Sequence, residues 1–467
     1  MPRHALCIHA HFYQPSREDP YSGIIPQEQG AEPFRNWNEK INADCYAPNA
    51  RLGNFEKISF NLGPTLTRWM EQNAQDTLAL ITESERRYMN RTATVNAMAQ
   101  PYHHTILPLA SLRDKQTQVR WGIADYTHTY GFAPEGMWLP ETAVDEETLA
   151  VLAENGIRYT ILAPWQAEGE VDVTQPYRVE LAGGRSMSVF FYHSGLSTGI
   201  SFNAETTANA DSFIQNCLKN VYSANDEQDQ LILLASDGEL YGHHQPFRDL
   251  FLSYLLDGAL TQASIEYTTP AKWLREHPPV KTVQIRNRTS WSCMEGVERW
   301  RGECACTPHG AWKKPLRDLM NQVAELVDAC YLDCAANWLR EPWRARDEYI
   351  SVLLGDVSFA AWLDQEGKVP LDQSEIGQLQ HLMAAQFERQ RMFTSCGWFF
   401  EDFDRIEPRN NVQYAAHAIA LSERVSGKDL RSGLVPALEA VKSWRSGVTA
   451  RDVFEGALQR FETDLQR

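Results

Sequence analysis

The sequence predicts an α/β protein in which strand and helix repeats precede a mainly helical region, and three observations support this fold class. Residues 135–164 have the pattern of one strand, helix, strand unit. Residues 230–235 form a continuous apolar run, which is typical of a strand buried on both faces of a sheet. From Pro315 onward, apolar residues recur at helical spacing. Roughly seven strand and helix units fit into the first ~280 residues, close to the length that a closed α/β barrel needs.

Length and charge narrow the class of protein. A chain of 467 residues is long enough for a large core and for two or more domains. Its net charge of −17, with no basic run of five or more residues, argues against a nucleic-acid partner. The sequence has neither an N-terminal apolar stretch of signal-peptide length nor a run of eighteen apolar residues. We therefore expect a cytoplasmic protein that binds neither nucleic acid nor a membrane.

The first predicted strand places two histidines on one side of the chain. Residues 4–9 form a short apolar segment that leads to His9 and His11. Side chains at positions i and i+2 of an extended segment point to the same side. Such a pair suits a metal ion or a hydroxyl-rich ligand, and a pair of hydrogen-bonded structural histidines is the alternative.

A long polar segment comes next, followed by regular elements. Residues 16–56 have little periodicity, and a segment of this length inside a compact domain is usually functional, so we expect a lid over the active edge. The strand that we predict at 92–99 leads to His103 and His104. The pattern predicts the other elements as a helix at 60–71, a strand at 77–81 and a helix at 115–130.

Glu141 stands at the end of an apolar run. In parallel α/β folds, the C-terminal ends of the strands form the edge that carries the chemistry. Asp145 has the features of a helix cap, because Val144 and Leu149 are spaced as a hydrophobic staple around it. A strand is predicted to follow at 157–164. Glu141 is thus a candidate catalytic residue, and a surface glutamate favourable to the helix dipole is the alternative.

A second carboxylate occupies the same kind of position. The pattern predicts a strand at 187–192, a helix at 211–221 and a strand at 230–235, which ends shortly before Asp237. The carboxyl ends of parallel strands meet at one edge of a sheet, so we expect Asp237 to face the same site as Glu141.

Two carboxylates at one edge, with histidines and tryptophans nearby, point to the cleavage of glycosidic bonds. One carboxylate attacks the anomeric carbon while the other protonates the leaving oxygen. The alternative is a metal-dependent hydrolase, of the deacetylase or phosphatase type, in which His9, His11 and Asp237 hold the metal.

The nine cysteines are an odd number spread through a large chain, which favours reduced thiols over a disulfide framework. Cys293, Cys304 and Cys306 lie in a segment without a clean period. A thiolate metal site is one interpretation, but the spacing is not that of a zinc ribbon and no fourth ligand is evident. We interpret them as buried free cysteines and expect the protein to need no metal and no other cofactor.

A helical region is predicted beyond Pro315, packed on or beside the strands. The aromatic insert at 394–402 suits either the mouth of the barrel or an interface between domains. Further helical patterns cover residues 345–363, 374–393, 409–426 and 451–465.

Several motifs resemble those of glycoside hydrolase family 57, in the order of that family. They are His9-Ala10-His11 with Gln14-Pro15, Met137-Trp138-Leu139-Pro140-Glu141, Ser236-Asp237-Gly238-Glu239, and Thr289-Ser290-Trp291-Ser292-Cys293 followed by Gly296-Val297-Glu298-Arg299-Trp300. The resemblance covers roughly residues 1–310 and implies an incomplete seven-stranded (β/α) barrel and a retaining mechanism on α-glucans. Residues 311–467 resemble an uncharacterised helical domain attached to one subgroup of the family.

The resemblance also implies roles for single residues. Glu141 matches the nucleophile of the family, and Asp237 matches its general acid and base. The substrate-binding residues that it implies are His9 and His11 in the subsite on the cleaved side, Trp291 as a stacking platform, and Trp138 and His103 from their positions beside the motifs.

Two departures from the family pattern concern specificity more than reaction type. Phe12-Tyr13 interrupts the first motif, and Gln100-Pro101-Tyr102-His103-His104 is an imperfect match to the second. The resemblance is compatible with an amylase, a 4-α-glucanotransferase or a branching-type enzyme, and a carbohydrate-binding relative without catalysis is a further alternative. Linkage, chain length and oligomeric state have no signature in the sequence.

Overall fold

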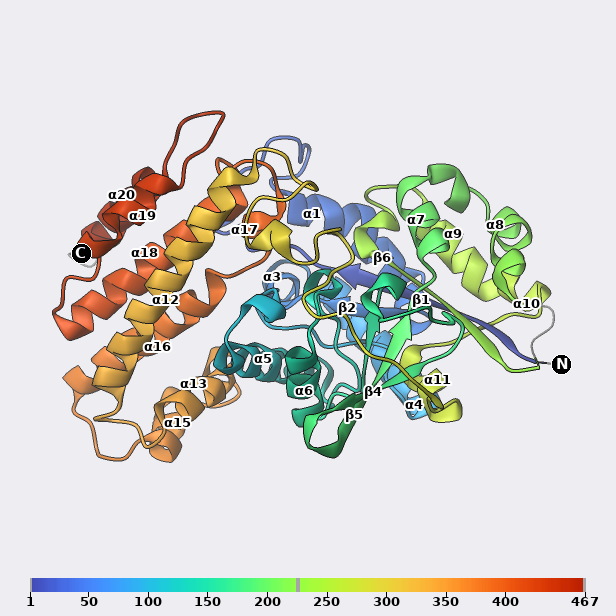
Figure 1. Cartoon of the computed structure of the whole chain (residues 1–467), viewed down its shortest axis with the longest axis horizontal. Coiled ribbons are helices and arrows are strands. Elements are labelled where there is room, and N and C mark those ends of the chain that lie inside the picture. Colours follow the sequence, from blue (N-terminus) through green and yellow to red (C-terminus); the bar gives the residue numbers. More distant parts are fainter. Residues whose placement is uncertain (1, 224–226, 465–467) are drawn as a thin grey trace. The chain divides into compact units, whose positions relative to one another are not determined.

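The computed structural model describes residues 2–223 and 227–464, and its path is drawn in Figure 1. The chain forms two compact units. The first, here called the sheet unit, consists of Met1–Gln14, Gln27–Tyr102 and Tyr126–Trp291. The second, the helical unit, consists of Pro15–Pro26, His103–Asp125 and Ser292–Arg467. The helical unit therefore includes two early segments that the sequence had assigned to the catalytic region.

The first sheet of the sheet unit is built around β1. In it, His9 lies opposite Ala235 and His11 opposite Asp237, so the histidines and the second carboxylate share one end of the sheet. β1 and β6 run side by side over almost their full length (Figure 1). The strands are β1 (His4–Phe12), with β6 (Gln230–Asp237), β2 (Ser59–Leu62) and β7 (Glu266–Tyr267) as its parallel partners.

The second sheet has the order β3-β5-β4-β8. β3 and β5 are parallel, whereas β4 and β5 are antiparallel. The N–H of His193, just after β5, donates to the carbonyl of Leu233 in β6 at 2.7 Å. The strands are β3 (Tyr159–Leu162), β4 (Tyr177–Leu181), β5 (Arg185–Phe191) and β8 (Lys281–Thr282).

Short parallel bridges connect β2 to β3 through two extended segments. They pair Phe60 with Ala97, Ala99 with Met137, and Gly136 with Tyr159. Gly136 is required there, because a Cβ on it would lie 2.4 Å from the ring of Tyr159. The strand predicted at 92–99 is thus represented by these bridges and not by a full strand.

The prediction of a strand at 77–81 is wrong. These residues belong to α4 (Gln75–Thr92), in which Ile81, Glu85 and Tyr88 are buried at helical spacing. The helix predicted at 60–71 begins later than expected, because residues up to Leu62 pair with β1 as β2 and α3 (Pro64–Asn73) follows. In both places, tertiary contacts decide between two structures that short apolar patterns leave open.

The prediction of a loop over residues 16–56 is wrong for the second half of that segment. α1 (Trp37–Ile41), a π-helical turn (Asn42–Tyr46) and α2 (Ala47–Arg51) form one continuous helical stretch. Cys45 and Tyr46 are fully buried in it. This stretch is part of the core of the sheet unit.

The helix that follows Glu141 is confirmed. In α6 (Glu146–Glu154), the side chain of Asp145 accepts from the N–H of Thr148, which caps the helix as predicted. The remaining helices that begin before residue 300 are α5 (Leu112–Tyr130), α7 (Ser194–Phe202), α8 (Ala210–Asn216), α9 (Arg248–Tyr254), α10 (Leu260–Gln262) and α11 (Pro270–Glu276).

The C-terminal part of the helical unit packs α12, α16 and α18 against one another (Figure 1). Its helices are α12 (Lys313–Ala335), α13 (Pro342–Glu348), α14 (Ile350–Leu353), α15 (Phe359–Glu366), α16 (Gln373–Arg391), α17 (Cys396–Phe399), α18 (Ile406–Ser426), α19 (Val435–Ala440) and α20 (Ala450–Asp464). No helix in the described part of the chain is both long and apolar enough to cross a membrane.

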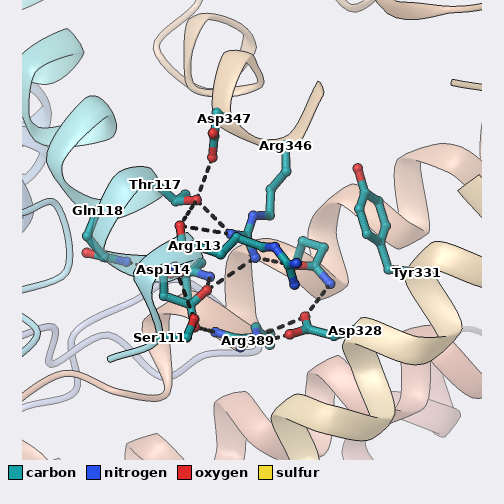
Figure 2. A network of polar contacts seen from close by, with 12 residues as sticks. Ser111, Arg113, Asp114, Thr117, Gln118, Asp328, Tyr331, Arg346, Asp347 and Arg389 are labelled. Carbon is teal, nitrogen blue, oxygen red and sulfur yellow. Dashed lines mark hydrogen bonds and ion pairs between the residues drawn. The ribbon is translucent and has the colours of Figure 1, made fainter. Parts of the chain in front are cut away.

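A buried network of charges fixes helices within this unit (Figure 2). Asp114 of α5 lies 3.3 Å from Arg346 of α13 and 2.9 Å from Arg389 of α16. Arg389 also pairs with Asp328 of α12 at 2.9 Å. Burial would raise the pKa of Asp114, but the two guanidinium groups outweigh it and lower the pKa to about 2.

Candidate active site

Glu141 is held in a sharp turn at the edge of the sheet unit. It belongs to a single helical turn, Pro140–Thr142, in which Glu141 (φ 59°) and Thr142 (φ 48°) both have left-handed backbone conformations. Such conformations cost of order 1–2 kcal/mol each for residues with a Cβ. The surrounding structure must therefore hold the turn in place.

The side-chain amide of Gln166 holds the turn at Glu141 in place. Its Oε1 accepts from Thr142 Oγ1 at 2.9 Å and from the N–H of Ala163 at 2.8 Å, and its Nε2 donates to the carbonyl of Thr142 at 2.8 Å. Gln166 is fully buried, so these bonds are shielded from water. The turn is thereby tied to the end of β3.

Trp291 orients the carboxylate of Glu141. Its indole N–H donates to Glu141 Oε2 at 2.9 Å, and its backbone N–H donates to the carbonyl of Glu141 at 3.0 Å. A hydrogen bond to an ionised acceptor is shorter and stronger than a neutral one. Trp291 therefore fixes the direction of the carboxylate, a contact that adds to its predicted role as a stacking platform.

Asp237 lies at the C-terminal end of β6, opposite His11 of β1. Water reaches its side chain, yet the surrounding protein removes much of its hydration. This desolvation, together with the negative charge of Glu141, raises the pKa of Asp237 to about 7. The two predicted catalytic carboxylates are thus close enough for the charge of Glu141 to affect the ionisation of Asp237.

His9 and His11 are neutral imidazoles in the wall beside Asp237. Nδ1 of His9 lies 2.9 Å from Ser59 Oγ, and Nδ1 of His11 lies 3.1 Å from Asn61 Oδ1. Burial lowers the pKa of His9 to about 3 and that of His11 to about 4. Nε2 of His9 has no hydrogen-bond partner among the described residues.

Trp138 packs behind these histidines. Its ring stacks on His9 at 4.6 Å and on His11 at 5.3 Å between centroids, and it meets Trp291 edge to face at 5.1 Å. Its side chain is fully buried, as is that of His9.

His103 belongs to the helical unit, so the structure does not group it with the carboxylates of the sheet unit. It is 3% exposed, its Nδ1 lies 3.0 Å from Gln118 Nε2, and its ring packs edge to face against Phe387. These contacts are those of a buried structural histidine.

Glu239 is a third acid that the sequence reasoning passed over. Tyr46 donates its hydroxyl to Glu239 Oε1 at 2.6 Å, and the N–H of Tyr13 donates to the same oxygen at 3.2 Å. Burial raises the pKa of Glu239 to about 7, with the hydrogen bond from Tyr46 opposing the shift and the charge of Asp237 adding to it. The sequence contains one indication of Glu239, which is that it lies two residues after Asp237 in the same motif.

An aromatic series lies beside Glu141, and two of its members were not predicted. Trp165, which is 47% exposed, meets Tyr192 at 6.1 Å, and Tyr192 meets Trp291 at 6.4 Å, both edge to face. The indole N–H of Trp165 donates to the carbonyl of Ser290 at 3.0 Å. Trp165 follows a predicted strand, as Glu141 does, and this position could have identified it as a candidate site residue.

Within the described ranges, 2–223 and 227–464, one group of side chains has its ligand atoms close enough together to share a metal ion. It consists of Cys293, Cys304 and Cys306. His9, His11 and Asp237, the set expected for a metal-dependent hydrolase, do not form such a group within these ranges.

Comparison with known proteins places the chain in a family. The sequence profile of glycosyl hydrolase family 57 matches residues 11–286, which is more than half of the chain. The chain belongs to glycosyl hydrolase family 57. A second profile, that of a domain of unknown function named DUF3536, matches residues 309–467.

This family 57 protein has two similar relatives in sequence. It is 20% identical over 233 residues to a 4-alpha-glucanotransferase of Thermococcus litoralis, covering 48% of this chain and 33% of the relative. It is 22% identical over 249 residues to an alpha-amylase of Pyrococcus horikoshii, covering 52% of this chain and 35% of the relative. The matched region thus spans about a third of each relative's length.

Solved structures share the mixed α/β fold of this family 57 protein. An exo-type maltose-forming amylase from Pyrococcus sp. ST04 matches with a TM-score of 0.73 and 15% identity, covering 97% of this chain and 88% of that one. A branching enzyme from Pyrococcus horikoshii matches with a TM-score of 0.64 and 14% identity, covering 97% of each chain.

Proposed function

We propose that this protein is a retaining enzyme that acts on α-glucans, as an amylase, a 4-α-glucanotransferase or a branching enzyme. The observation that carries the proposal is the coupling of Glu141 and Asp237, since the charge of the first helps to raise the pKa of the second to about 7. A protonated acid beside an ionised carboxylate is the pair that a retaining glycosidase needs. The names of the two sequence relatives support α-glucan as the substrate class.

In the first step, the carboxylate of Glu141 attacks the anomeric carbon of the bound glucan. Asp237 gives its proton to the glycosidic oxygen, the bond from that oxygen to the anomeric carbon breaks, and the leaving chain departs as an alcohol. The product is a glycosyl ester on Glu141. The hydrogen bond from Trp291 to Oε2 keeps the carboxylate oriented for attack.

In the second step, Asp237 is ionised and acts as a base. It removes a proton from water or from a hydroxyl group of an acceptor sugar, whose oxygen attacks the anomeric carbon. The ester bond breaks, Glu141 returns as a carboxylate and Asp237 is protonated again. Two inversions restore the original configuration, and the identity of the acceptor decides between hydrolysis and transfer.

Sugar binding falls to the residues around the two acids. We assign His9 and His11 to hydrogen bonds with sugar hydroxyls, because a neutral imidazole offers one donor and one acceptor. Trp291 and the exposed Trp165 provide apolar ring faces of the kind that stack on sugars. Trp138 keeps the two histidines and Trp291 in position.

We further propose that the sheet unit contains the incomplete seven-stranded (β/α) barrel expected from the sequence. The order β6, β1, β2 continues through the bridge segments at 97–99 and 136–137 to β3 and β5, which supports this arrangement. The hydrogen bond from His193 to Leu233 supports the return to β6. In this proposal, residues 1–310 contain the catalytic domain and residues 311–467 form a helical domain.

The test is incubation of the purified protein with maltooligosaccharides of one length, followed by chromatography of the products. Simple shortening identifies a hydrolase, and products longer than the starting material identify a transferase. Glu141→Gln and Asp237→Asn should each lower the rate by at least about a thousandfold. Glu83→Gln, which changes a half-buried glutamate on α4, should leave the rate unchanged. Full activity in Glu141→Gln would exclude this function.

A further inference from the structure

Cys293, Cys304 and Cys306 form a compact group of thiols in the helical unit. Their Sγ atoms all lie within 4.8 Å of one another, and those of Cys293 and Cys306 are 3.8 Å apart. Cys293 and Cys304 are buried, whereas Cys306 is half-buried, so the group is open on one side. The catalytic mechanism proposed above does not use these residues.

We propose that the three cysteines bind one zinc ion as thiolates, with water or another small ligand in the fourth position. In a tetrahedral site with zinc–sulfur bonds of about 2.3 Å, neighbouring sulfur atoms lie about 3.8 Å apart. The Cys293–Cys306 separation already has this value, and no pair needs to close by more than about 1 Å.

A buried cation supports this assignment. Lys313 is fully buried, and its Nζ has no hydrogen-bond partner among the described residues. An ammonium group in that position is costly unless nearby charges stabilise it. Cys293 and Cys304 are among the groups that stabilise its charge. Zinc with three thiolates carries one net negative charge, which Lys313 would neutralise.

Backbone and side-chain contacts hold the two cysteine segments together. The N–H of Met294 donates to Cys306 Sγ at 3.3 Å. Across the two segments, Glu295 Oε1 accepts from the N–H of Ala305 at 2.8 Å. Arg299 Nη2 donates to the carbonyl of Cys306 at 3.5 Å, which brings a guanidinium group to this segment. These contacts hold the three thiols close together before any metal binds.

The competing use of these thiols is a disulfide between Cys293 and Cys306. That bond requires an oxidant to remove two electrons and two protons from the pair, and it leaves Cys304 unused. It also removes Cys293 from the groups that stabilise the buried charge of Lys313. Zinc binding uses all three sulfur atoms and the cation together.

The proposal is tested by measuring zinc in the full chain, purified without a histidine tag. After removal of metal by a chelator and addition of zinc, we expect one zinc ion per chain. Replacement of zinc by cobalt should give the sulfur-to-cobalt charge-transfer absorption of a thiolate site. Cys293→Ser, Cys304→Ser and Cys306→Ser should each lose this absorption, whereas Cys217→Ser, a change to a half-buried cysteine of the sheet unit, should keep it.

Lys313→Gln provides a second readout that leaves the sulfur ligands intact. Because residues outside the ligand set tune metal sites, this change should weaken zinc binding about 10- to 100-fold while the limiting stoichiometry stays at one. The proposal is overturned if the wild-type chain, with its fold verified by circular dichroism, takes up neither zinc nor cobalt. It is also overturned if mass spectrometry finds a Cys293–Cys306 disulfide in the native protein, or if Lys313→Gln leaves zinc affinity unchanged.

Discussion

At the scale of single residues, the proposed chemistry depends on two similar carboxylates that must hold different protonation states. Desolvation and the charge of Glu141 raise the pKa of Asp237 to about 7, so that about half of Asp237 is protonated in neutral solution. Glu141 has a donor, the indole of Trp291, that stabilises its ionised form. Their different surroundings thus decide which carboxyl group acts as the acid and which as the nucleophile, although the two groups react alike when free in solution.

The pH dependence of glucan cleavage follows from this assignment. Asp237 must be protonated to act as an acid, so kcat/KM should fall as the pH rises through about 7. An activated donor such as α-maltosyl fluoride needs no proton on its leaving group, so the first step of Asp237→Asn with this donor should show no such fall. Initial rates from pH 5 to pH 9 provide the measurement. A wild-type profile that stays flat over this range would contradict the role of Asp237.

The sequence was sufficient to find the two carboxylates that we propose as the catalytic pair, but it did not reveal the residues around them. Glu141 and Asp237 were predictable because each follows an apolar strand that ends at the same edge. The contact between Glu239 and Tyr46 was not predictable, because it joins residues almost two hundred positions apart. The assignment of His103 to the helical unit was not predictable either, because the chain passes into that unit a few residues beyond the bridge at Ala99.

At the scale of elements, the turn that carries Glu141 depends on few contacts for its conformation. Two successive left-handed residues depend on the side-chain amide of Gln166 for their conformation. Gln166→Ala should therefore lower kcat by about a hundredfold, the cost of misplacing a reacting group by roughly 1 Å, while KM changes little.

Steady-state kinetics on a maltooligosaccharide provide the measurement for Gln166→Ala. Gln175→Ala is the matched control, since Gln175 is a half-buried glutamine of the same unit that donates to the carbonyl of Asp229. It should retain the wild-type kcat. A rise in KM at constant kcat in Gln166→Ala would show that Gln166 affects binding and not the position of the nucleophile.

Elements were predictable where their patterns were long and clean. The strands at β1, β5 and β6 and the capped helix α6 match their predictions closely. The error at 77–81 arose because a five-residue apolar segment fits a strand or one face of a helix equally well. Buried Glu85 and Tyr88, further along the same face, identify it as α4.

At the scale of the whole molecule, the two units are interleaved along the chain. Segments 15–26 and 103–125 interrupt the sheet unit in sequence and belong to the helical unit. The composition of these two segments does not reveal that they belong to the helical unit, because both carry ordinary polar and amphipathic patterns. The contacts of Asp114 with Arg346 and Arg389 show that the helical unit takes a charged partner from one of these segments (Figure 2).

Asp114→Ala tests how much this contact contributes to the free energy of unfolding. It leaves Arg346 buried without its nearest carboxylate, so we expect the free energy of unfolding to fall by about 3–5 kcal/mol. Lys314→Ala removes the exposed pair with Asp318 on α12 and should cost less than about 1 kcal/mol. Urea unfolding followed by far-ultraviolet circular dichroism compares the two variants. Equal losses in both would show that the buried network contributes no more than a surface ion pair.

The pH dependence of the same stability has a definite sign. The folded pKa of Asp114, about 2, lies below that of an unfolded aspartate, about 3.9. Its contribution to stability is therefore complete above the unfolded value and is lost as the pH falls from about 4 towards 2. The stability difference between the wild type and Asp114→Ala should shrink over that window.

The mechanism as a whole is tested most directly by identifying the residue that becomes glycosylated. Asp237→Asn should be incubated with α-maltosyl fluoride, because fluoride leaves without acid assistance while the second step lacks its base, so that an ester accumulates. After digestion, mass spectrometry is predicted to find a maltosyl group on the peptide that contains Glu141, and none in the double variant that also carries Glu141→Gln. A maltosyl group on any other carboxylate, or release of β-maltose as the first product, would contradict double displacement at Glu141.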